Sequence, residues 1–149
     1  MNQFDRSLPM MLYRTLNAVL PAFRAIFSEF GITERQWRVL RTLWDNDGCS
    51  LLALADSALI PGPSLVGVID RLARDGLVVR RRSEIDRRVV HIFVTRNGKA
   101  LKHAVQPKVD AVYAALETSI SPARWTLLFK ALDEIVDRNT ANSTLAANR

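Results

Sequence analysis

Residues 60–95, IPGPSLVGVIDRLARDGLVVRRRSEIDRRVVHIFVT, decide the fold of this chain. The first half predicts an amphipathic helix, because its apolar residues are spaced three and four apart at Leu65, Val68, Ile69 and Leu72. The segment Pro61-Gly62-Pro63 precedes this helix and Gly76 ends it. Two strands are predicted next, over 77–82 and 89–95, the second with alternating apolar residues. The stretch therefore predicts a helix followed at once by a two-stranded hairpin.

Positive charge is concentrated in the same stretch. Between residues 71 and 88 there are seven arginines and three acidic residues, a net of +4 out of +6 for the whole chain. A charge run is usually a solvated surface, but this excess directly follows an amphipathic helix. A helix fits the major groove of DNA, and an arginine at a loop tip fits the narrow minor groove. The pattern favours nucleic-acid binding.

Further helices are predicted on both sides of this segment. Apolar spacing and capping residues place them over 7–30, from Thr33 to the turn at 46–48, over 51–59, from Thr95 to about 118, and from 122 to about 139. Ser7, Thr33, Ser50 and Thr95 are the expected N-caps, and Gln36 completes a capping box with Thr33. Pro21 and Pro107 predict kinks in the first and fifth helices.

The chain length of 149 residues predicts one domain, 1–149. Within it we expect a DNA-binding lobe at 33–95, dimerisation helices at 7–30 and 96–139, and a flexible tail at 140–149. The two terminal helical regions have wide apolar stripes and little to pack against in a small core. A homodimer joined through them explains those stripes. A local bundle within one chain is the alternative.

Composition excludes several classes of protein. A sequence pI of about 10.2 implies an anionic partner. No signal peptide or membrane-spanning run is visible, and Cys49 is the only cysteine, so we expect a cytoplasmic protein without membrane association. No catalytic constellation, cofactor motif or metal-ligand spacing stands out, and His91 and His103 are the only histidines. The chain is therefore not expected to be an enzyme or to need a cofactor.

DNA contacts are expected from the outer face of the 63–74 helix and from the hairpin tip. Ser64 lies in the first turn, where free N–H groups favour a phosphate. Arg71 reaches toward a guanine edge or a phosphate, and Val66 toward a thymine methyl group. At the tip, Asp86 is expected to orient Arg88 toward the minor groove. The full set of expected DNA contacts is Ser50, Pro63, Ser64, Val66, Gly67, Arg71, Arg74, Asp86, Arg87 and Arg88.

The arginines at 80–82 alternate faces along their strand, so they cannot all touch one surface. At least one of them is expected to be solvated or paired with Glu84 or Asp86.

A ligand site is the second candidate. Arg24 borders an aromatic stripe formed by Phe23 and Phe27, and Arg41 borders a stripe that contains Trp37. An arginine at the edge of an aromatic surface binds an aryl carboxylate in two-point fashion while the ring packs on Phe or Trp. The alternative is that both arginines extend to solvent and the aromatics are core.

The run 63–78, followed by Asp86-Arg87-Arg88 and by residues 95–99, resembles the MarR family of bacterial winged-helix regulators. Residues 33–40 are similar to the second helix of that family, and the similarity extends from about 8 to 138. The resemblance implies a mostly α fold with a small β-hairpin wing, a winged helix-turn-helix with terminal dimerisation helices.

The same resemblance implies a function. It places the recognition helix at 63–74, the wing at 86–88 and the dimer contacts on the first, fifth and sixth helices. It implies repression at a pseudo-palindromic double-stranded operator, relieved when a small phenolic or carboxylate ligand of aromatic catabolism binds between the dimerisation helices and the DNA-binding lobe. The alternative is a winged-helix protein-interaction module or a non-sensing architectural DNA-binding factor. A protein-binding wing has no need of an arginine excess.

Overall fold

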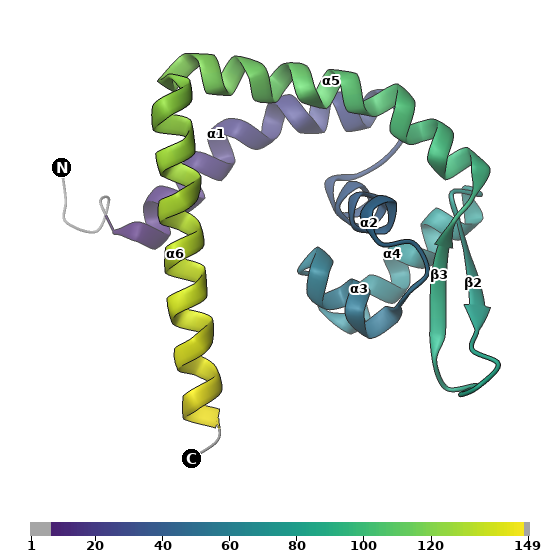
Figure 1. Ribbon diagram of the computed structural model, residues 1–149. Coiled ribbons are helices and arrows are strands. Elements are labelled where there is room, and N and C mark those ends of the chain that lie inside the picture. The colour runs from purple at the N-terminus through teal and green to yellow at the C-terminus, as the bar shows by residue number, and fades with distance from the viewer. Residues whose placement is uncertain (1–6, 148–149) are drawn as a thin grey trace. The chain divides into compact units, whose positions relative to one another are not determined.

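A computed structural model of the chain describes residues 7–147, with side chains to residue 140 (Figure 1). Its elements are α1 (Leu8–Glu29), α2 (Glu34–Asp45), β1 (Cys49–Ser50), α3 (Leu51–Ala58), α4 (Gly62–Arg74), β2 (Val78–Arg82), β3 (Val90–Val94), α5 (Arg96–Ile120) and α6 (Pro122–Ala147). The chain divides into two compact units, Met1–Val109 and Asp110–Arg149, and α5 contributes to both. The mostly helical fold with a small β wing is the predicted one.

Side-chain caps begin three of the helices as predicted. At α2, Thr33 Oγ1 accepts the Gln36 N–H at 3.2 Å and Gln36 Oε1 accepts the Thr33 N–H at 2.8 Å, which completes the capping box. Ser50 Oγ accepts the Ala53 N–H at 3.2 Å, and Thr95 Oγ1 accepts the Gly98 N–H at 3.1 Å. Ser7 occupies the N-cap position of α1 without a side-chain bond. A side-chain cap therefore marks the start of α2, α3 and α5. Helix α4 has no such cap and begins between Pro61 and Pro63.

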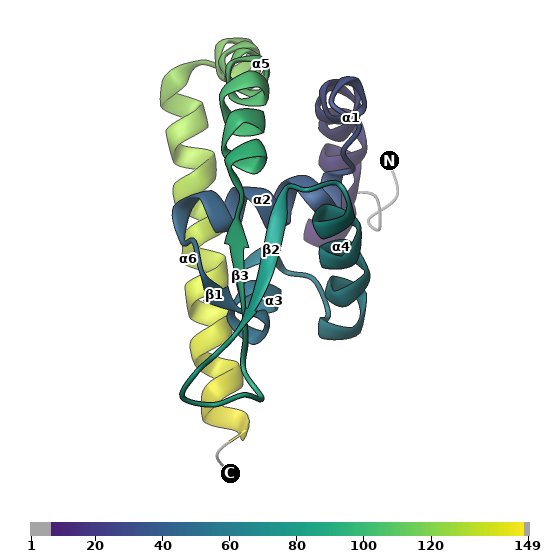
Figure 2. The same ribbon diagram turned by 90° about the vertical axis from the view of Figure 1, so that its right-hand side faces the viewer.

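The β structure differs from the predicted two-stranded hairpin. It is a three-stranded antiparallel sheet in the order β1-β3-β2 (Figure 2). Val78 to Arg82 pair with Val94 to Val90, and Cys49 and Ser50 pair with Ile92 and His91. The two-residue strand β1 was missed because it is too short to show alternation. Its consequence is that the wing is attached to the α2–α3 connection as well as to α4.

The core of the first unit lies between α2, α3, α4 and the sheet. All four apolar residues of the predicted α4 stripe are buried: Leu65, Val68, Ile69 and Leu72. They join a cluster with Leu40, Leu43, Leu54 and Ile92, none of which exposes any surface. Burial of one face of α4 leaves its other face toward solvent.

Gly98 sits where α5 begins against the sheet. A Cβ at this position would collide with the Leu77 carbonyl oxygen and would lie 2.6 Å from Val94 Cγ1. The Gly98 carbonyl accepts a hydrogen bond from Trp44 Nε1 at 3.1 Å. The first turn of α5 is thereby held directly against the sheet and α2, with no room for a side chain.

The second unit consists of the end of α5 and α6. Trp125 and Phe129 of α6 pack against each other with ring centroids 4.9 Å apart. Large apolar side chains remain exposed along α6, at Leu127, Leu128, Phe129, Ile135 and Val136. The segment for which a flexible tail is predicted, 140–149, overlaps the last turns of α6, and its residues 148 and 149 lie outside the described residues. That flexibility, the kinks at Pro21 and Pro107, and the assignment of the whole chain to one domain stay predictions.

No single helix in the described part of the chain is both long and apolar enough to span a membrane. Helices α3 and α4 together reach that length and composition, but a bend of 102° separates them. Their apolar residues, including Leu54, Leu65 and Ile69, belong to the buried core.

Candidate nucleic-acid interface

The outer face of α4 presents the residues expected to contact DNA. Pro63, Ser64, Val66, Gly67, Arg71 and Arg74 are all exposed. A Cβ built on Gly67 would meet no atom within 4 Å, so packing inside the protein does not require glycine there. This face of α4 is therefore exposed to solvent, with Gly67 at its centre and Arg71 and Arg74 at its C-terminal end.

Arg80 of β2 connects this helix to the wing. Its Nη2 lies 2.6 Å from Asp70 Oδ1 and 3.4 Å from the Val66 carbonyl oxygen. One arginine of the 80–82 run is thus paired, but with Asp70 of α4 rather than with the predicted Glu84 or Asp86. The reason is the strand register, which turns Arg80 toward α4 and leaves the tip acids several residues away. This ion pair fixes α4 against β2 and neutralises the acidic residue of the outer face.

Its neighbours Arg81 and Arg82 have other surroundings. The Arg81 guanidinium carbon lies 5.0 Å from the centroid of the Phe93 ring, a cation–π contact between β2 and β3. Arg82 is exposed and pairs through its backbone with Val90. Arg82 is therefore the member of the run with the most freedom to reach an external phosphate.

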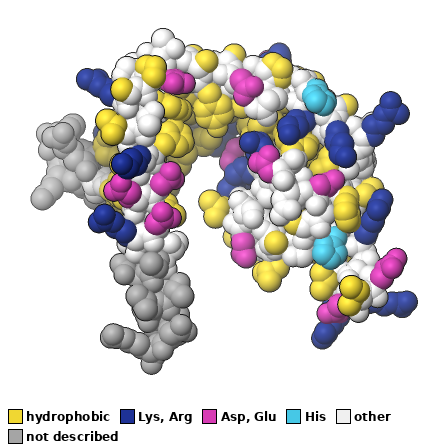
Figure 3. Space-filling model, in the orientation of Figure 1, with side chains coloured by type: hydrophobic (Ala, Val, Ile, Leu, Met, Phe, Trp, Pro, Cys, Tyr) yellow, Lys and Arg dark blue, Asp and Glu magenta, His cyan; other side chains and the backbone are white. Residues whose placement is uncertain are grey.

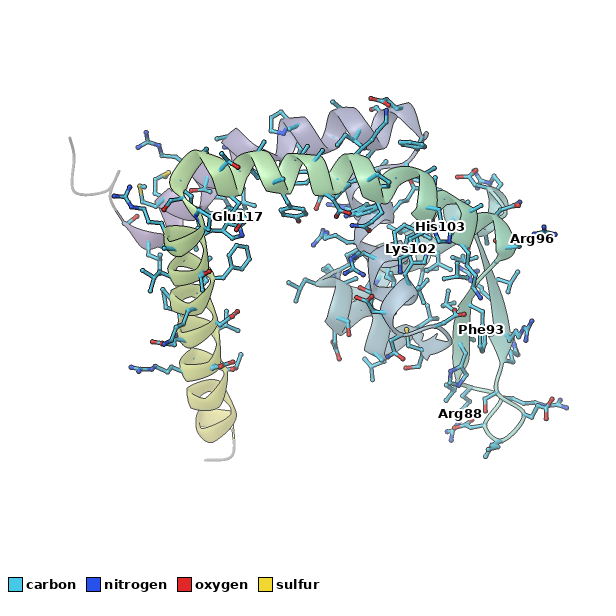
Figure 4. All side chains as sticks on the ribbon, turned by 45° about the horizontal axis from the view of Figure 1, so that its top comes forward. Arg88, Phe93, Arg96, Lys102, His103 and Glu117 are labelled. Carbon is cyan, nitrogen blue, oxygen red and sulfur yellow. The ribbon has the colours of Figure 1, made fainter. Side chains whose placement is uncertain are left out.

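The wing tip holds Arg88 in the predicted way. Asp86 Oδ1 accepts the Arg88 backbone N–H at 3.0 Å and its Nε at 3.2 Å, and Asp86 Oδ2 lies 3.4 Å from Nη2. The Arg88 guanidinium, and then its backbone N–H, lower the pKa of Asp86 below its ordinary value. The carboxylate is accordingly charged at neutral pH. The Arg88 side chain itself is 92% exposed, at the end of the wing remote from Phe93 and α5 (Figure 4).

Ser83 closes the turn from the other side. Its Oγ accepts the N–H groups of Ile85 and Asp86, both at 3.2 Å, and the backbone bond from Val89 N to Asp86 O is 2.9 Å long. This network orders a tip of mostly exposed residues and offers Arg87 and Arg88 to solvent. Figure 3 shows Lys and Arg side chains along the wing on one face of the molecule.

Ser50 and Ile85 lie in surroundings that their residue types do not suggest. Ser50 is half-buried in β1, and its hydroxyl is engaged in capping α3, so its availability to DNA is small. Ile85 is fully exposed at the wing tip and is not among the DNA contacts expected from the sequence. An isolated isoleucine inside a charged turn was the available signal, because it had no apolar stripe to join. Proteins that bind the minor groove frequently insert apolar side chains, isoleucine among them, between base steps.

The residues predicted to bind a ligand lie in different surroundings. Phe27 stacks on Trp37 with centroids 4.9 Å apart and lies 6.4 Å from Phe23, so these rings join the packing between α1 and α2. Arg24 and Phe27 line a cavity of about 410 Å³ that also includes Arg71. Arg41 instead pairs with Asp45, with Nη1 and Oδ1 2.6 Å apart.

Within the described residues, no group of three or more His, Cys, Asp or Glu side chains could hold a metal ion. Burial raises the pKa of the Cys49 thiol, which disfavours a reactive thiolate.

Comparison with known proteins identifies the family. The model of the MarR family matches residues 32–90. The chain is 32% identical over 130 residues to the homoprotocatechuate degradative operon repressor of Escherichia coli, covering 87% of this chain and 88% of the repressor.

Two solved structures are similar over most of their length. NadR in complex with 4-hydroxyphenylacetate is 32% identical, with a TM-score of 0.77 over 91% of this chain and 96% of that one. The repressor CouR bound to a 23-mer DNA duplex is 26% identical, with a TM-score of 0.85 over the same shares of the two chains. The chain therefore belongs to the MarR family of winged-helix DNA-binding transcriptional regulators, which are not enzymes.

Proposed function

We propose that this protein is a homodimeric repressor that binds a pseudo-palindromic operator and is released by a small aromatic carboxylic or phenolic acid. The DNA-binding part of this proposal is supported by the exposed face of α4 and by the adjacent wing, in which Asp86 holds the exposed Arg88 side chain. Ser64, Val66, Gly67 and Arg71 would read the major groove, with Arg88 in the minor groove. Pro63, Arg74 and Arg87 would contact the backbone, and Ser50 would lie at the edge of the interface.

Exposed apolar surface supports the dimer. Leu8, Met11, Leu12 and Leu16 of α1 are each between 41% and 50% exposed, and α6 leaves Phe129 and Val136 at 47% and 58%. Contiguous apolar patches on a protein surface mark interaction sites. A self-association through 7–30 and 96–139 would bury both stripes and would present two copies of the 33–95 lobe with two-fold symmetry.

The relatives support the effector half. NadR has been solved with 4-hydroxyphenylacetate, and the Escherichia coli relative represses an operon for degradation of homoprotocatechuate. Both compounds are hydroxylated phenylacetates, in which an aromatic ring carries a carboxymethyl group. Phe23, Arg24, Phe27, Trp37 and Arg41 are the residues we propose for such a ligand, because they combine aromatic rings with guanidinium groups.

The DNA half is tested with the intergenic DNA next to the gene. We expect footprinting to show two protected half-sites about 10 base pairs apart, because two recognition helices lie about 34 Å apart in such dimers. The logarithm of the association constant should fall by about 0.9 per log unit of salt for each phosphate neutralised. Sedimentation should give twice the chain mass of 16.8 kDa.

A random-sequence competitor provides the control for that measurement. A repressor keeps its operator when the competitor is in excess. Complete loss of the complex would identify an architectural factor, and failure to bind any DNA at low salt would favour a protein-interaction module.

The effector half is tested by thermal shift and operator release. We expect 4-hydroxyphenylacetate, or a related benzoate or cinnamate, to raise Tm, with about 2.7 kcal/mol of stabilisation at 100 times Kd. The same acid should release the operator. The amide of each acid is the control, since it keeps the ring and loses the charge. Equal effects of acid and amide would contradict recognition of a carboxylate.

A further inference from the structure

Ile85 lies at the tip of the wing, in the loop between β2 and β3 (Figure 1). Its side chain is fully exposed. Every other isoleucine of the first unit is at most 8% exposed, namely Ile26, Ile32, Ile60, Ile69 and Ile92. An exposed apolar side chain contributes little to folding and gains free energy only when another surface covers it. Within the part of the first unit that the structure describes, Ile85 therefore has no packing role.

The backbone around Ile85 is nevertheless ordered by hydrogen bonds. Ser83 Oγ accepts the N–H groups of Ile85 and Asp86, both at 3.2 Å. The Ser83 N–H donates to the Val89 carbonyl oxygen at 2.9 Å, which closes the loop at its base. The isoleucine is thus presented from a preformed turn, so covering its side chain costs little loop entropy.

Ile85 lies close to Arg88 in the same turn. Asp86, the next residue after Ile85, holds the arginine, with Oδ1 3.2 Å from Arg88 Nε. Three steps of about 3.8 Å separate Ile85 from Arg88 along the chain, so their Cα atoms are at most about 11 Å apart. Base pairs of a duplex are stacked about 3.4 Å apart. When Arg88 occupies a minor groove, Ile85 is consequently within about three base pairs of that contact.

The surroundings of Ile85 fit DNA better than a protein partner. A stable protein interface buries about 800 Å² on each side, usually around an apolar centre. The residues next to Ile85 in the loop are instead charged, and Arg87 and Arg88 are exposed. A wedge in the minor groove requires only one apolar side chain, and basic residues beside it contact the backbone and the groove.

We infer that Ile85 inserts as an apolar wedge at a base step of the minor groove, beside the Arg88 contact, and that it contributes to the choice of operator. This inference rests on the proposed function, in which Arg88 enters the minor groove. Insertion partly unstacks a base step, and the TA and CA/TG steps are the most easily deformed. Arg88 favours the narrow groove of A·T-rich DNA. The wing therefore selects half-sites in which a TA or CA/TG step lies within about three base pairs of an A·T-rich minor groove.

Ile85→Ala separates an apolar contact from an electrostatic one. The side chain is fully exposed, so the variant should fold as wild type does, which circular dichroism checks. Neutralising a phosphate releases counterions and sets the salt dependence of binding, whereas an apolar contact does not. In anisotropy titrations at several salt concentrations we expect operator binding at least about tenfold weaker, with the salt dependence of wild type. Arg88→Ala should reduce that salt dependence. Ile85→Leu keeps the apolar volume and should bind within about threefold of wild type.

The closing experiment detects the unstacking itself. 2-Aminopurine is placed at successive positions of the half-site, since its fluorescence rises when neighbouring bases no longer stack on it. We expect bound wild-type protein to raise the fluorescence at one step in the minor groove that the wing protects, and Ile85→Ala to abolish the rise. Val79→Ala is the matched control. Val79 is an apolar residue of the same wing, 40% exposed and paired with Phe93 at the other end of β2. This control should bind and unstack DNA as wild type does.

The opposite results are distinct. Operator binding by Ile85→Ala within about twofold of wild type would overturn the inference, as would an equal loss in Val79→Ala. A salt dependence reduced as in Arg88→Ala would overturn it too, because the tip would then act through charge. The same holds if bound wild-type protein raises the 2-aminopurine fluorescence at no position. In all these cases the wild type still binds its operator and the proposed function stands. Absence of operator binding by the wild type would refute the proposed function and this inference with it.

Discussion

Replacing Ile69 by alanine is expected to lower the free energy of unfolding by about 2–5 kcal/mol. Ile69 exposes no surface and lies in the core cluster on the buried side of α4. Truncation removes three carbons from a site walled by helices and the sheet, which can collapse only partly. Urea denaturation followed by circular dichroism gives the difference in unfolding free energy.

Val66→Ala is the matched control on the same helix. Val66 is 45% exposed on the outer face, so its truncation should change stability by no more than about 0.5 kcal/mol. At temperatures where both variants are folded, Val66→Ala should weaken operator binding more than Ile69→Ala does, because Val66 lies on the outer face of α4. If Ile69→Ala were as stable as Val66→Ala, the assignment of the two faces of α4 would be wrong.

Arg88→Ala is expected to weaken operator binding by about 1–3 kcal/mol per wing, and so by about 2–6 kcal/mol for a dimer with two wings. Asp86 makes two contacts to the Arg88 side chain and one to its backbone, so the proposed groove contact would cost this guanidinium little further orientational freedom. Anisotropy titrations at fixed salt concentration measure the loss.

Arg81→Ala removes the same charge from the same wing and serves as the control. Its guanidinium packs over Phe93, so we expect a smaller effect that high salt suppresses further. Equal losses in the two variants would show that the wing acts only through its net charge. Asp86→Asn should fall between them, because it keeps the arginine and loosens its position.

Local signals in the sequence were sufficient for the helices of the lobe. The spacing of Leu65, Val68, Ile69 and Leu72 predicts which side of α4 is buried, since helical periodicity depends on neighbouring residues alone. The capping box at Thr33 and Gln36 is similarly local. The Asp86–Arg88 contact was predictable because the two residues are two apart in a tight turn.

Contacts between distant segments could not be predicted in this way. The pairing of Arg80 with Asp70 depends on how β2 packs against α4, and no spacing rule relates a strand to the preceding helix. The strand β1 exists only because Cys49 and Ser50 meet β3, and two residues carry no periodicity. For the same reason the sequence predicts Arg24 beside aromatic residues, but it does not predict that Arg24, Arg35 and Arg71 line one cavity, because that depends on how three helices pack.

Gly98 has a consequence for how the wing moves. The first turn of α5 touches the Leu77 backbone and Val94, the two ends of the wing strands, and Trp44 grips its carbonyl oxygen. With no side chain between these surfaces, α5 cannot tilt at its start without carrying β2 and β3 along or breaking the Trp44 bond. The wing tip lies at the far end of those strands, so a small rotation of α5 becomes a larger displacement of Arg88. A glycine that permits this close packing would thus make the proposed minor-groove contact of Arg88 sensitive to the orientation of α5.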